Sequence, residues 1–210
     1  MLVIRKICLA VTFVATASFA TASAAAPLEV FVNTSSLSGT PSTLAFDVVD
    51  GGAPSNDVVI SSFSTNGVLG AASSFGDVTG TFPGSVVIGD TSFFNEYAQD
   101  LTLGTFLRFA FNTTNHPAEA TSFPDAFSFF VLNPLTGLPL FSTSDPTGAD
   151  ALFVFNIGAA SPLQIHSSSA VSLRIDEPTA VSAPSTALLL LLAGFAALIY
   201  APPSPYKRAG

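Results

Sequence analysis

The chain has 210 residues, a formal net charge of −8 and a single cysteine, which excludes a disulfide framework and a cysteine-based metal site. Between residues 25 and 183, only two basic residues, Arg108 and Arg174, stand against all 14 acidic residues of the chain. A body with this charge repels nucleic acid and anionic lipid surfaces, so we exclude nucleic acid as a partner. Most of the 20 phenylalanines of the chain lie in this body and supply a buried core, which argues against disorder.

Residues 1–24 have the three parts of a secretory signal peptide. A short positive stretch precedes an apolar run over residues 7–20, and small residues follow. Ala22 and Ala24 fit an A-x-A cleavage site, with cleavage one or two residues later as the alternative. The 14-residue apolar run is short for a membrane span, which takes about 20 residues. We therefore predict an exported protein whose mature chain lacks Cys8.

Residues 25–176 are predicted to form a single all-β extracellular domain. Segments that suit half-buried strands are separated by turns rich in Gly, Pro, Asn, Asp and Ser, and Asn66-Gly67 is typical of a tight turn. Residues 93–100 predict one short helix. We expect a β-sandwich or a jelly-roll-like fold, because many short strands follow one another without a long internal repeat. The predicted strands cover residues 28–32, 43–49, 58–64, 77–82, 85–88, 101–111, 126–132, 151–157 and 171–175.

The C-terminal end consists of a linker, an apolar segment and a basic tip. After the linker at residues 177–186, 14 apolar residues follow without interruption, and the stretch 182–201 reaches the length that crosses a bilayer. Prolines then end the helix, and the basic tip sets its orientation. We predict a transmembrane helix over 187–201, with the body outside and a short basic cytoplasmic tail at 202–210. The alternative is a C-terminal segment packed in the core, which would leave this leucine-rich run without a polar face.

A family resemblance rests on residues that flank this apolar segment. They are Val181, Pro184, Ser185, Thr186, the Leu-Ala-Gly at 192–194, Lys207 and Arg208. Their order resembles the C-terminal signal of the PEP-CTERM proteins of Gram-negative bacteria, in which Val-Pro-Glu-Pro-Ser-Thr precedes an apolar helix and a basic cluster. The chain departs from that signal at Ser182-Ala183, which replaces Pro-Glu, and in a thin basic cluster that four residues, 202–205, delay.

The resemblance implies a route of export. In that family an exosortase-type membrane enzyme recognises the tail, and the body passes from an inner-membrane-tethered intermediate to the cell surface or the extracellular space. Such systems accompany exopolysaccharide production, so exopolysaccharide is a candidate partner. The opening of the body, residues 27–35, also resembles one body type of that family, which brings no known activity.

Catalytic motifs are scarce in the sequence. It contains no G-x-S-x-G elbow, no phosphate-binding P-loop and no H-E-x-x-H pair. The two histidines, His116 and His166, are predicted to lie in loops or on the surface. Glu29 on the first strand and Glu177 in the linker form no persuasive pair for glycoside hydrolysis, and no tryptophan is present to stack on sugars. We predict a non-enzymatic protein with no catalytic residue and no cofactor.

Two aspartate-containing loops make calcium an alternative. One runs from Asp47 through Asp50 to Asp57, and the other contains Asp145 and Asp150. Neither matches the spacing of known calcium loops, and aspartate in a turn commonly bonds the turn itself. We therefore predict no metal site and favour a surface or extracellular-matrix protein associated with exopolysaccharide. A secreted glycan- or calcium-binding β-sandwich module and a secreted hydrolase are the alternatives.

Overall fold

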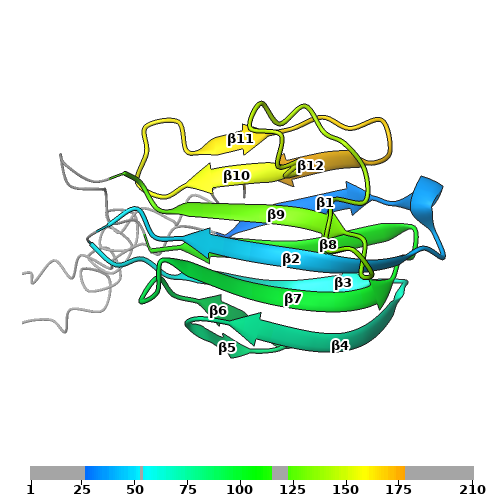
Figure 1. Ribbon diagram of the computed structural model, residues 1–210, viewed down its shortest axis with the longest axis horizontal. Helices are drawn as coiled ribbons and strands as arrows, with labels where there is room; N and C mark the ends of the chain where they lie inside the picture. The colour runs from blue at the N-terminus through cyan, green and yellow to red at the C-terminus, as the bar shows by residue number, and fades with distance from the viewer. Residues whose placement is uncertain (1–26, 53, 115–122, 178–210) are drawn as a thin grey trace, which may run out of the picture.

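The computed structural model describes residues 27–52, 54–114 and 123–177. Their strands form two antiparallel sheets of six strands each, packed face to face around one core (Figure 1). This arrangement confirms the predicted all-β sandwich. Within those ranges, no helix has the length and apolar character that a membrane crossing requires. The predicted signal peptide and the predicted transmembrane helix lie outside the described residues.

The order of the strands is β12-β1-β8-β3-β6-β5 in sheet A and β11-β10-β9-β2-β7-β4 in sheet B. The chain crosses repeatedly between the sheets, which places β1 beside β8, β3 beside β6 and β2 beside β7, the winding of a jelly roll. Sheet A consists of β1 (Leu28–Asn33), β3 (Val58–Thr65), β5 (Val78–Gly80), β6 (Val86–Ile88), β8 (Phe106–Thr113) and β12 (Ser172–Asp176). Sheet B consists of β2 (Pro41–Val49), β4 (Val68–Phe75), β7 (Phe94–Thr102), β9 (Ala126–Leu132), β10 (Phe153–Asn156) and β11 (Leu163–Ile165). A 3-10 turn, η1 (Ser35–Leu37), follows β1.

Phenylalanine rings join the two sheets in the core. The alternation of side chains along β9 turns Phe127 and Phe129 inward, where both are fully buried. Phe46 of β2 lies 4.9 Å from Phe129 in its own sheet and 5.2 Å from Phe109 of sheet A, measured between ring centroids. Tilted and edge-to-face contacts at these distances are favourable for aromatic rings. Many of the phenylalanines of the sequence are therefore explained by packing in the core.

The predicted helix at 93–100 is wrong, because residues 94–100 belong to strand β7. Its inward positions include two polar residues, Asn95 and Gln99, which hide the alternation expected of a strand. The Asn95 side chain accepts a hydrogen bond from the Asp77 N–H at 2.7 Å, and the Gln99 amide donates to the Gly70 carbonyl at 3.1 Å. Polar side chains are tolerated in this interior because backbone groups satisfy them.

The turn at Asn66-Gly67 is confirmed, but it joins β3 of sheet A to β4 of sheet B and does not close a hairpin. A Cβ atom on Gly67 would lie 2.3 Å from the Thr102 carbonyl oxygen, so only glycine allows this close approach.

The strand predicted over 101–111 is divided between β7 and β8 by residues 103–105. Strands β4 and β11 had not been predicted.

The first and last strands of the sandwich are neighbours. Strand β1 pairs antiparallel with β12, and Glu29 lies opposite Asp176. The described chain therefore enters and leaves the sandwich at the same end (Figure 1).

Candidate functional site

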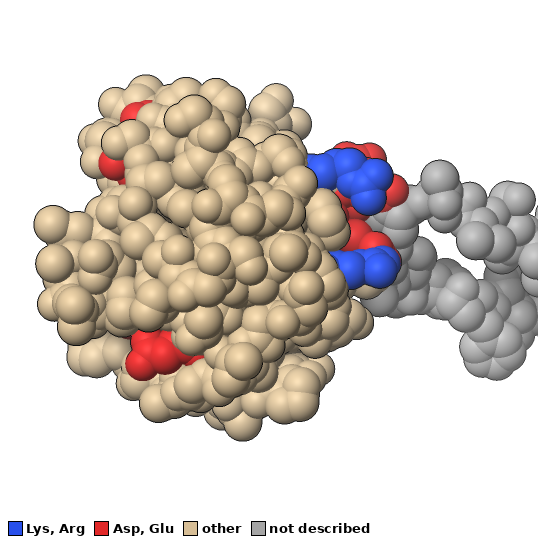
Figure 2. All heavy atoms as spheres, turned by 90° about the vertical axis from the view of Figure 1, so that its right-hand side faces the viewer, with Lys and Arg blue, Asp and Glu red and all other residues tan. Residues whose placement is uncertain are grey.

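Basic side chains gather on one flank of the molecule. Figure 2 shows two neighbouring basic patches, each beside acidic atoms, on a surface that is otherwise mostly uncharged in this view. Arg108 of β8 and Arg174 of β12 are the two basic residues of the body, and both line a hollow of about 410 Å³ on the outer face of sheet A.

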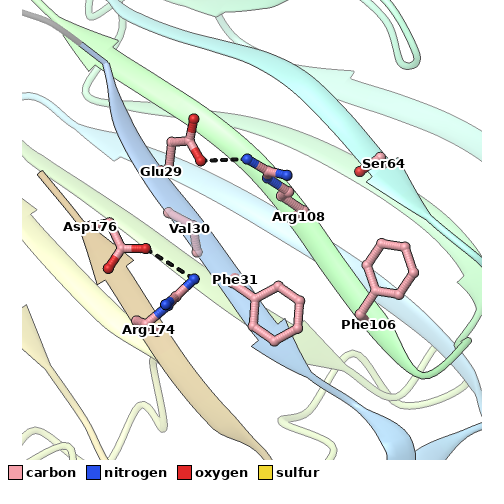
Figure 3. A pocket seen from close by; sticks show the side chains of 8 residues that line it. All are labelled: Glu29, Val30, Phe31, Ser64, Phe106, Arg108, Arg174 and Asp176. Carbon is pink, nitrogen blue, oxygen red and sulfur yellow. Dashed lines mark hydrogen bonds and ion pairs between the residues drawn. The ribbon is translucent and has the colours of Figure 1, made fainter. Parts of the chain in front are cut away.

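Figure 3 shows the residues that line this hollow, which is the middle of a longer depression that we call the sheet A groove. A second hollow of about 400 Å³ shares Phe31 and Arg174 with it, on the β12 side. A third, of about 210 Å³, shares Arg108 and extends toward β3. The groove thus crosses four strands of the sheet. The residues that define it are Glu29, Phe31, Ser62, Ser64, Phe106, Arg108, Arg174 and Asp176.

Strand register aligns the side chains of the groove. Phe31 lies opposite Arg174 on one side and opposite Arg108 on the other, and Arg108 lies in turn opposite Ser64 of β3. Directly opposed residues point to the same face of a sheet. Since neighbouring strands lie about 4.8 Å apart, these four residues form a row about 14 Å long.

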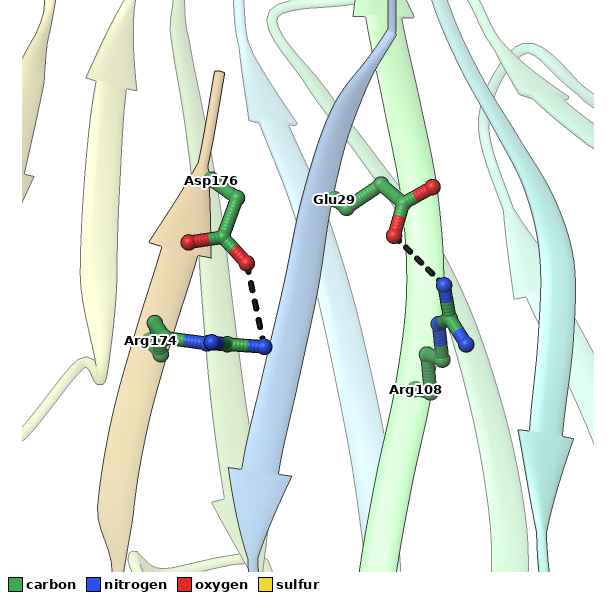
Figure 4. Close-up of polar contacts among 4 residues, drawn as sticks. All are labelled: Glu29, Arg108, Arg174 and Asp176. Atoms are coloured by element: carbon green, nitrogen blue, oxygen red, sulfur yellow. Dashed lines mark hydrogen bonds and ion pairs between the residues drawn. The ribbon is translucent and has the colours of Figure 1, made fainter. Parts of the chain in front are cut away.

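Each arginine of the groove is paired with a carboxylate (Figure 4). Arg108 Nη2 lies 2.6 Å from Glu29 Oε2, and Arg174 Nη2 lies 3.1 Å from Asp176 Oδ2. The arginine side chains are 55% and 71% exposed, so they keep N–H groups that a ligand can reach. The four charged groups sum to zero, and they offer both hydrogen-bond donors and acceptors.

Two aromatic rings lie beside these ion pairs. The centroids of Phe31 and Phe106 are 6.3 Å apart and their planes differ by 11°. Figure 3 shows the two rings side by side and nearly face-on. They therefore supply an apolar surface within a polar groove.

A backbone irregularity borders the β3 end of the groove. The pairing of β3 with β8 shifts between Ser61 and Ser64, and Ser62 has a φ of 55°. A left-handed conformation costs about 1 kcal/mol or more for a residue other than glycine, and bulges reorient side chains locally. The bulge brings the Ser62 and Ser64 positions to the hollow beside Arg108.

A different charged pair occupies the outer face of sheet B. Asp47 of β2 lies opposite Glu96 of β7, and no hydrogen-bond partner reaches the buried Asp47 Oδ1 within the part of the chain that the structure describes. Burial, followed by the negative charge of Glu96 and a hydrogen bond to it, raises the pKa of Asp47 to about 7. The Asp47 carboxyl group therefore keeps its proton up to about neutral pH.

Three further carboxylates cluster at one end of the sandwich. One oxygen from each of Asp50, Asp90 and Asp125 lies within 4.8 Å of the other two. Asp125 accepts hydrogen bonds from the Gly51 N–H at 2.8 Å and from the Asn56 amide at 2.7 Å. The Asn56 N–H donates to Asp90 at 2.6 Å. The cluster therefore ties down the β2–β3 loop.

The pKa of Asp90 is raised within this cluster. Burial is the largest cause, and the charges of Asp125 and Asp50 add to it, while the Asn56 N–H opposes it. The three carboxylates offer oxygen ligands of the kind that calcium takes, although calcium needs six to eight. The sequence had grouped Asp50 with Asp47 and Asp57, but the structure places Asp47 on the outer face of sheet B.

The aspartates of the second predicted loop bond the loop itself. Asp145 accepts hydrogen bonds from the N–H and hydroxyl of Thr147, at 2.9 and 2.8 Å, and from the Ala151 N–H at 3.2 Å. Burial of Asp145 opposes ionisation, but these bonds and the charge of His166 together lower its pKa. Asp150 accepts a backbone N–H within the same loop. The expectation that these aspartates serve the turn is confirmed.

The loop position predicted for His166 is confirmed, because it follows β11, but its side chain is buried and not at the surface. It is only 7% exposed, and its backbone N–H donates to the Leu152 carbonyl at 3.0 Å, which packs the segment after β11 against the sandwich. The remaining predicted site residues lie outside the described part of the chain. They are Ala22 and Ala24 of the cleavage site, Val181, Pro184, Ser185, Thr186, Lys207 and Arg208 of the sorting signal, and His116.

The groove residues had not been predicted as a site. Arg108 and Arg174 were visible as the only basic residues of the body, but they are far apart in the sequence and only the pairing of β1 with both β8 and β12 unites them. Fold and groove together define a two-sheet β-sandwich with an aromatic and charge-balanced groove on one outer face. Comparisons with protein-family models, with curated proteins and with solved structures each gave no match.

Proposed function

We propose that the protein is a non-enzymatic exported protein of the cell surface or extracellular matrix, sorted through its C-terminal end. The observation that carries this proposal is the order of elements there: a proline-containing motif at 184–186, an apolar segment at 187–201 and the basic pair Lys207-Arg208. An exosortase-type membrane enzyme is the proposed partner of this signal. Exopolysaccharide is the proposed partner of the body outside the cell.

The architecture of the sandwich supports this proposal. The last strand, β12, ends at Asp176, before the linker and the sorting motif begin. A cut within the linker would therefore leave all twelve described strands intact. Because β1 and β12 are neighbours, both end segments attach at one end of the body, and the outer faces of the sheets belong to the part that would be released.

The use of buried acids supports a non-enzymatic role. Asp125 and Asp145 are nearly fully buried, and each accepts at least two hydrogen bonds from its own surroundings. Their carboxylates hold loops in place. Their burial therefore has a structural explanation that needs no substrate.

Fractionation of the host cells tests the proposed sorting. We expect the full-length protein to reach the cell surface or the medium, and a variant without residues 182–210 to distribute differently. A matched control replaces residues 187–201 with an unrelated apolar helix of equal length and keeps the basic end, so that membrane insertion is retained and only recognition is changed. Identical distribution of the full-length and truncated proteins would contradict the proposal.

A further inference from the structure

We propose that the sheet A groove binds an uncharged polysaccharide chain. Phe31 and Phe106 would stack on sugar rings, while the Arg108–Glu29 and Arg174–Asp176 pairs hydrogen-bond to hydroxyl groups. This inference deepens the proposed function, on which it rests for its setting outside the cell, by naming the site and the chemistry of the partner.

The shape of the groove fits a chain better than a small molecule. Its three adjoining hollows share residues and extend from the edge strand β12 across β1 and β8 to β3. The row from Arg174 to Ser64 alone is about 14 Å long. An open depression of this kind accepts an extended polymer that continues beyond the protein at both ends, whereas sites for small molecules are deeper and enclose most of their ligand.

The Phe31–Phe106 pair provides the apolar part of the recognition. Sugar rings carry C–H groups on their faces, and these groups pack against aromatic rings that lie flat in a binding site. The two phenylalanine planes differ by only 11°, so both can lie against one chain. Phe31 is 36% exposed although it lies between two arginines, a position that leaves its ring open to a ligand.

The charge balance of the groove determines the kind of polysaccharide. Each arginine already has a carboxylate partner, so an anionic polymer would have to displace Glu29 or Asp176 or lie beside it. The rest of the body is strongly acidic and repels such a polymer. A hydroxyl group both donates and accepts hydrogen bonds, and therefore suits an arginine and a carboxylate side by side.

Binding of the full-length purified protein to defined polysaccharides tests the inference. The probes are uncharged dextran, mannan, xyloglucan and cellulose, with alginate as an anionic polymer of similar size. We expect binding to at least one uncharged probe and an affinity at least about tenfold weaker after Phe31→Ala or Arg174→Gln. Phe75→Ala is the matched control, because Phe75 is an exposed phenylalanine on the outer face of sheet B and is 63% exposed.

Thermal unfolding distinguishes a local loss of binding from a loss of the fold. Equal thermal unfolding of the variants shows that a loss of binding is local, and Arg174→Gln keeps the test valid if Phe31→Ala unfolds, because Arg174 is 71% exposed. Binding to alginate alone, binding to none of the probes, or equal loss of binding in Phe75→Ala would overturn the inference. None of these results depends on sorting, so failure here leaves the fractionation experiment to decide the proposed function independently.

Discussion

The outer faces of the two sheets each carry a pair of phenylalanines and a pair of charged side chains, but the charged pairs differ in sign. Each face has a pair of phenylalanines whose centroids are a little over 6 Å apart: Phe31 and Phe106 on sheet A at 6.3 Å, and Phe75 and Phe94 on sheet B at 6.2 Å. The planes of the first pair differ by 11° and those of the second by 37°. Each face also brings charged side chains together across neighbouring strands.

The charged neighbours make the faces different. On sheet A, Arg108 forms an ion pair with Glu29 of the neighbouring strand. The two opposite charges cancel, and together they offer hydrogen-bond donors and acceptors. On sheet B, Asp47 lies opposite Glu96, whose negative charge adds to burial in raising the pKa of Asp47. Cross-strand pairing therefore gives a charge-balanced surface on one face, where Arg108 and Glu29 are diagonal neighbours, and a pH-sensitive contact on the other, where Asp47 and Glu96 are directly opposed. This difference is why the proposed ligand site lies on sheet A.

The interior that both faces share should show the largest effect of mutation. Phe46→Ala removes a fully buried ring that contacts Phe129 and Phe109, and should lower the free energy of unfolding by about 3–5 kcal/mol. Phe75→Ala on the outer face of sheet B should change it by less than about 0.5 kcal/mol. Urea unfolding of both variants measures this difference in the free energy of unfolding. Equal changes would mean that Phe75 on the outer face contributes as much to stability as the buried Phe46.

The next largest effect should come from the acid pair on sheet B. Folding raises the pKa of Asp47 from 3.8 to about 7, so the folded state holds the proton more firmly than the unfolded state. The resulting penalty is absent below pH 3.8, grows as the pH rises toward 7 and is constant above it. Asp47→Asn should therefore stabilise the protein above pH 7, by at most about 4 kcal/mol, and leave it nearly unchanged at low pH.

Thermal unfolding between pH 4 and pH 8 measures this effect. Glu29→Gln is the matched acid-to-amide control on sheet A, where the acid faces an arginine. The control should show no gain in stability at high pH. If Asp47→Asn and Glu29→Gln gave the same pH profile, the distinction between the two faces would be lost.

The smallest effect should be that of the ion pair itself on stability. Arg108 and Glu29 are about half exposed, so water and salt screen their attraction. A double-mutant cycle with Arg108→Gln and Glu29→Gln should give a coupling free energy below about 1 kcal/mol that decreases with added salt. A coupling above about 2 kcal/mol would show that the pair holds the sheet together, and would weaken its assignment to ligand binding.

Runs of apolar and aromatic residues bounded by turn residues were sufficient to predict several strands. In β9, all residues but Ser128 are apolar, and the predicted and observed strands coincide at residues 126–132. Strand β4 was missed because its run of glycine, alanine and serine is mostly exposed and has no alternation. The sequence predicts a helix over much of β7 because Asn95 and Gln99 occupy inward positions that usually hold apolar residues.

The candidate site was beyond the reach of sequence patterns. Phe31, Arg108 and Arg174 become neighbours only because β1 is flanked by β8 and β12, a pairing that depends on the winding of the whole chain. The Asp47–Glu96 pair depends in the same way on the register of β2 with β7. Local composition indicated the strands, whereas long-range pairing determined which side chains meet.

The most direct test of the difference between the faces is to map ligand contacts by NMR. The full-length protein is titrated with the uncharged polysaccharide that it binds, and the side-chain resonances of the phenylalanines and arginines are followed. Saturable shifts at Phe31, Phe106, Arg108 and Arg174, with Phe75 and Phe94 unchanged, are the predicted result. Shifts confined to Phe75 and Phe94, or spread evenly over both faces, would contradict the assignment of the site to sheet A.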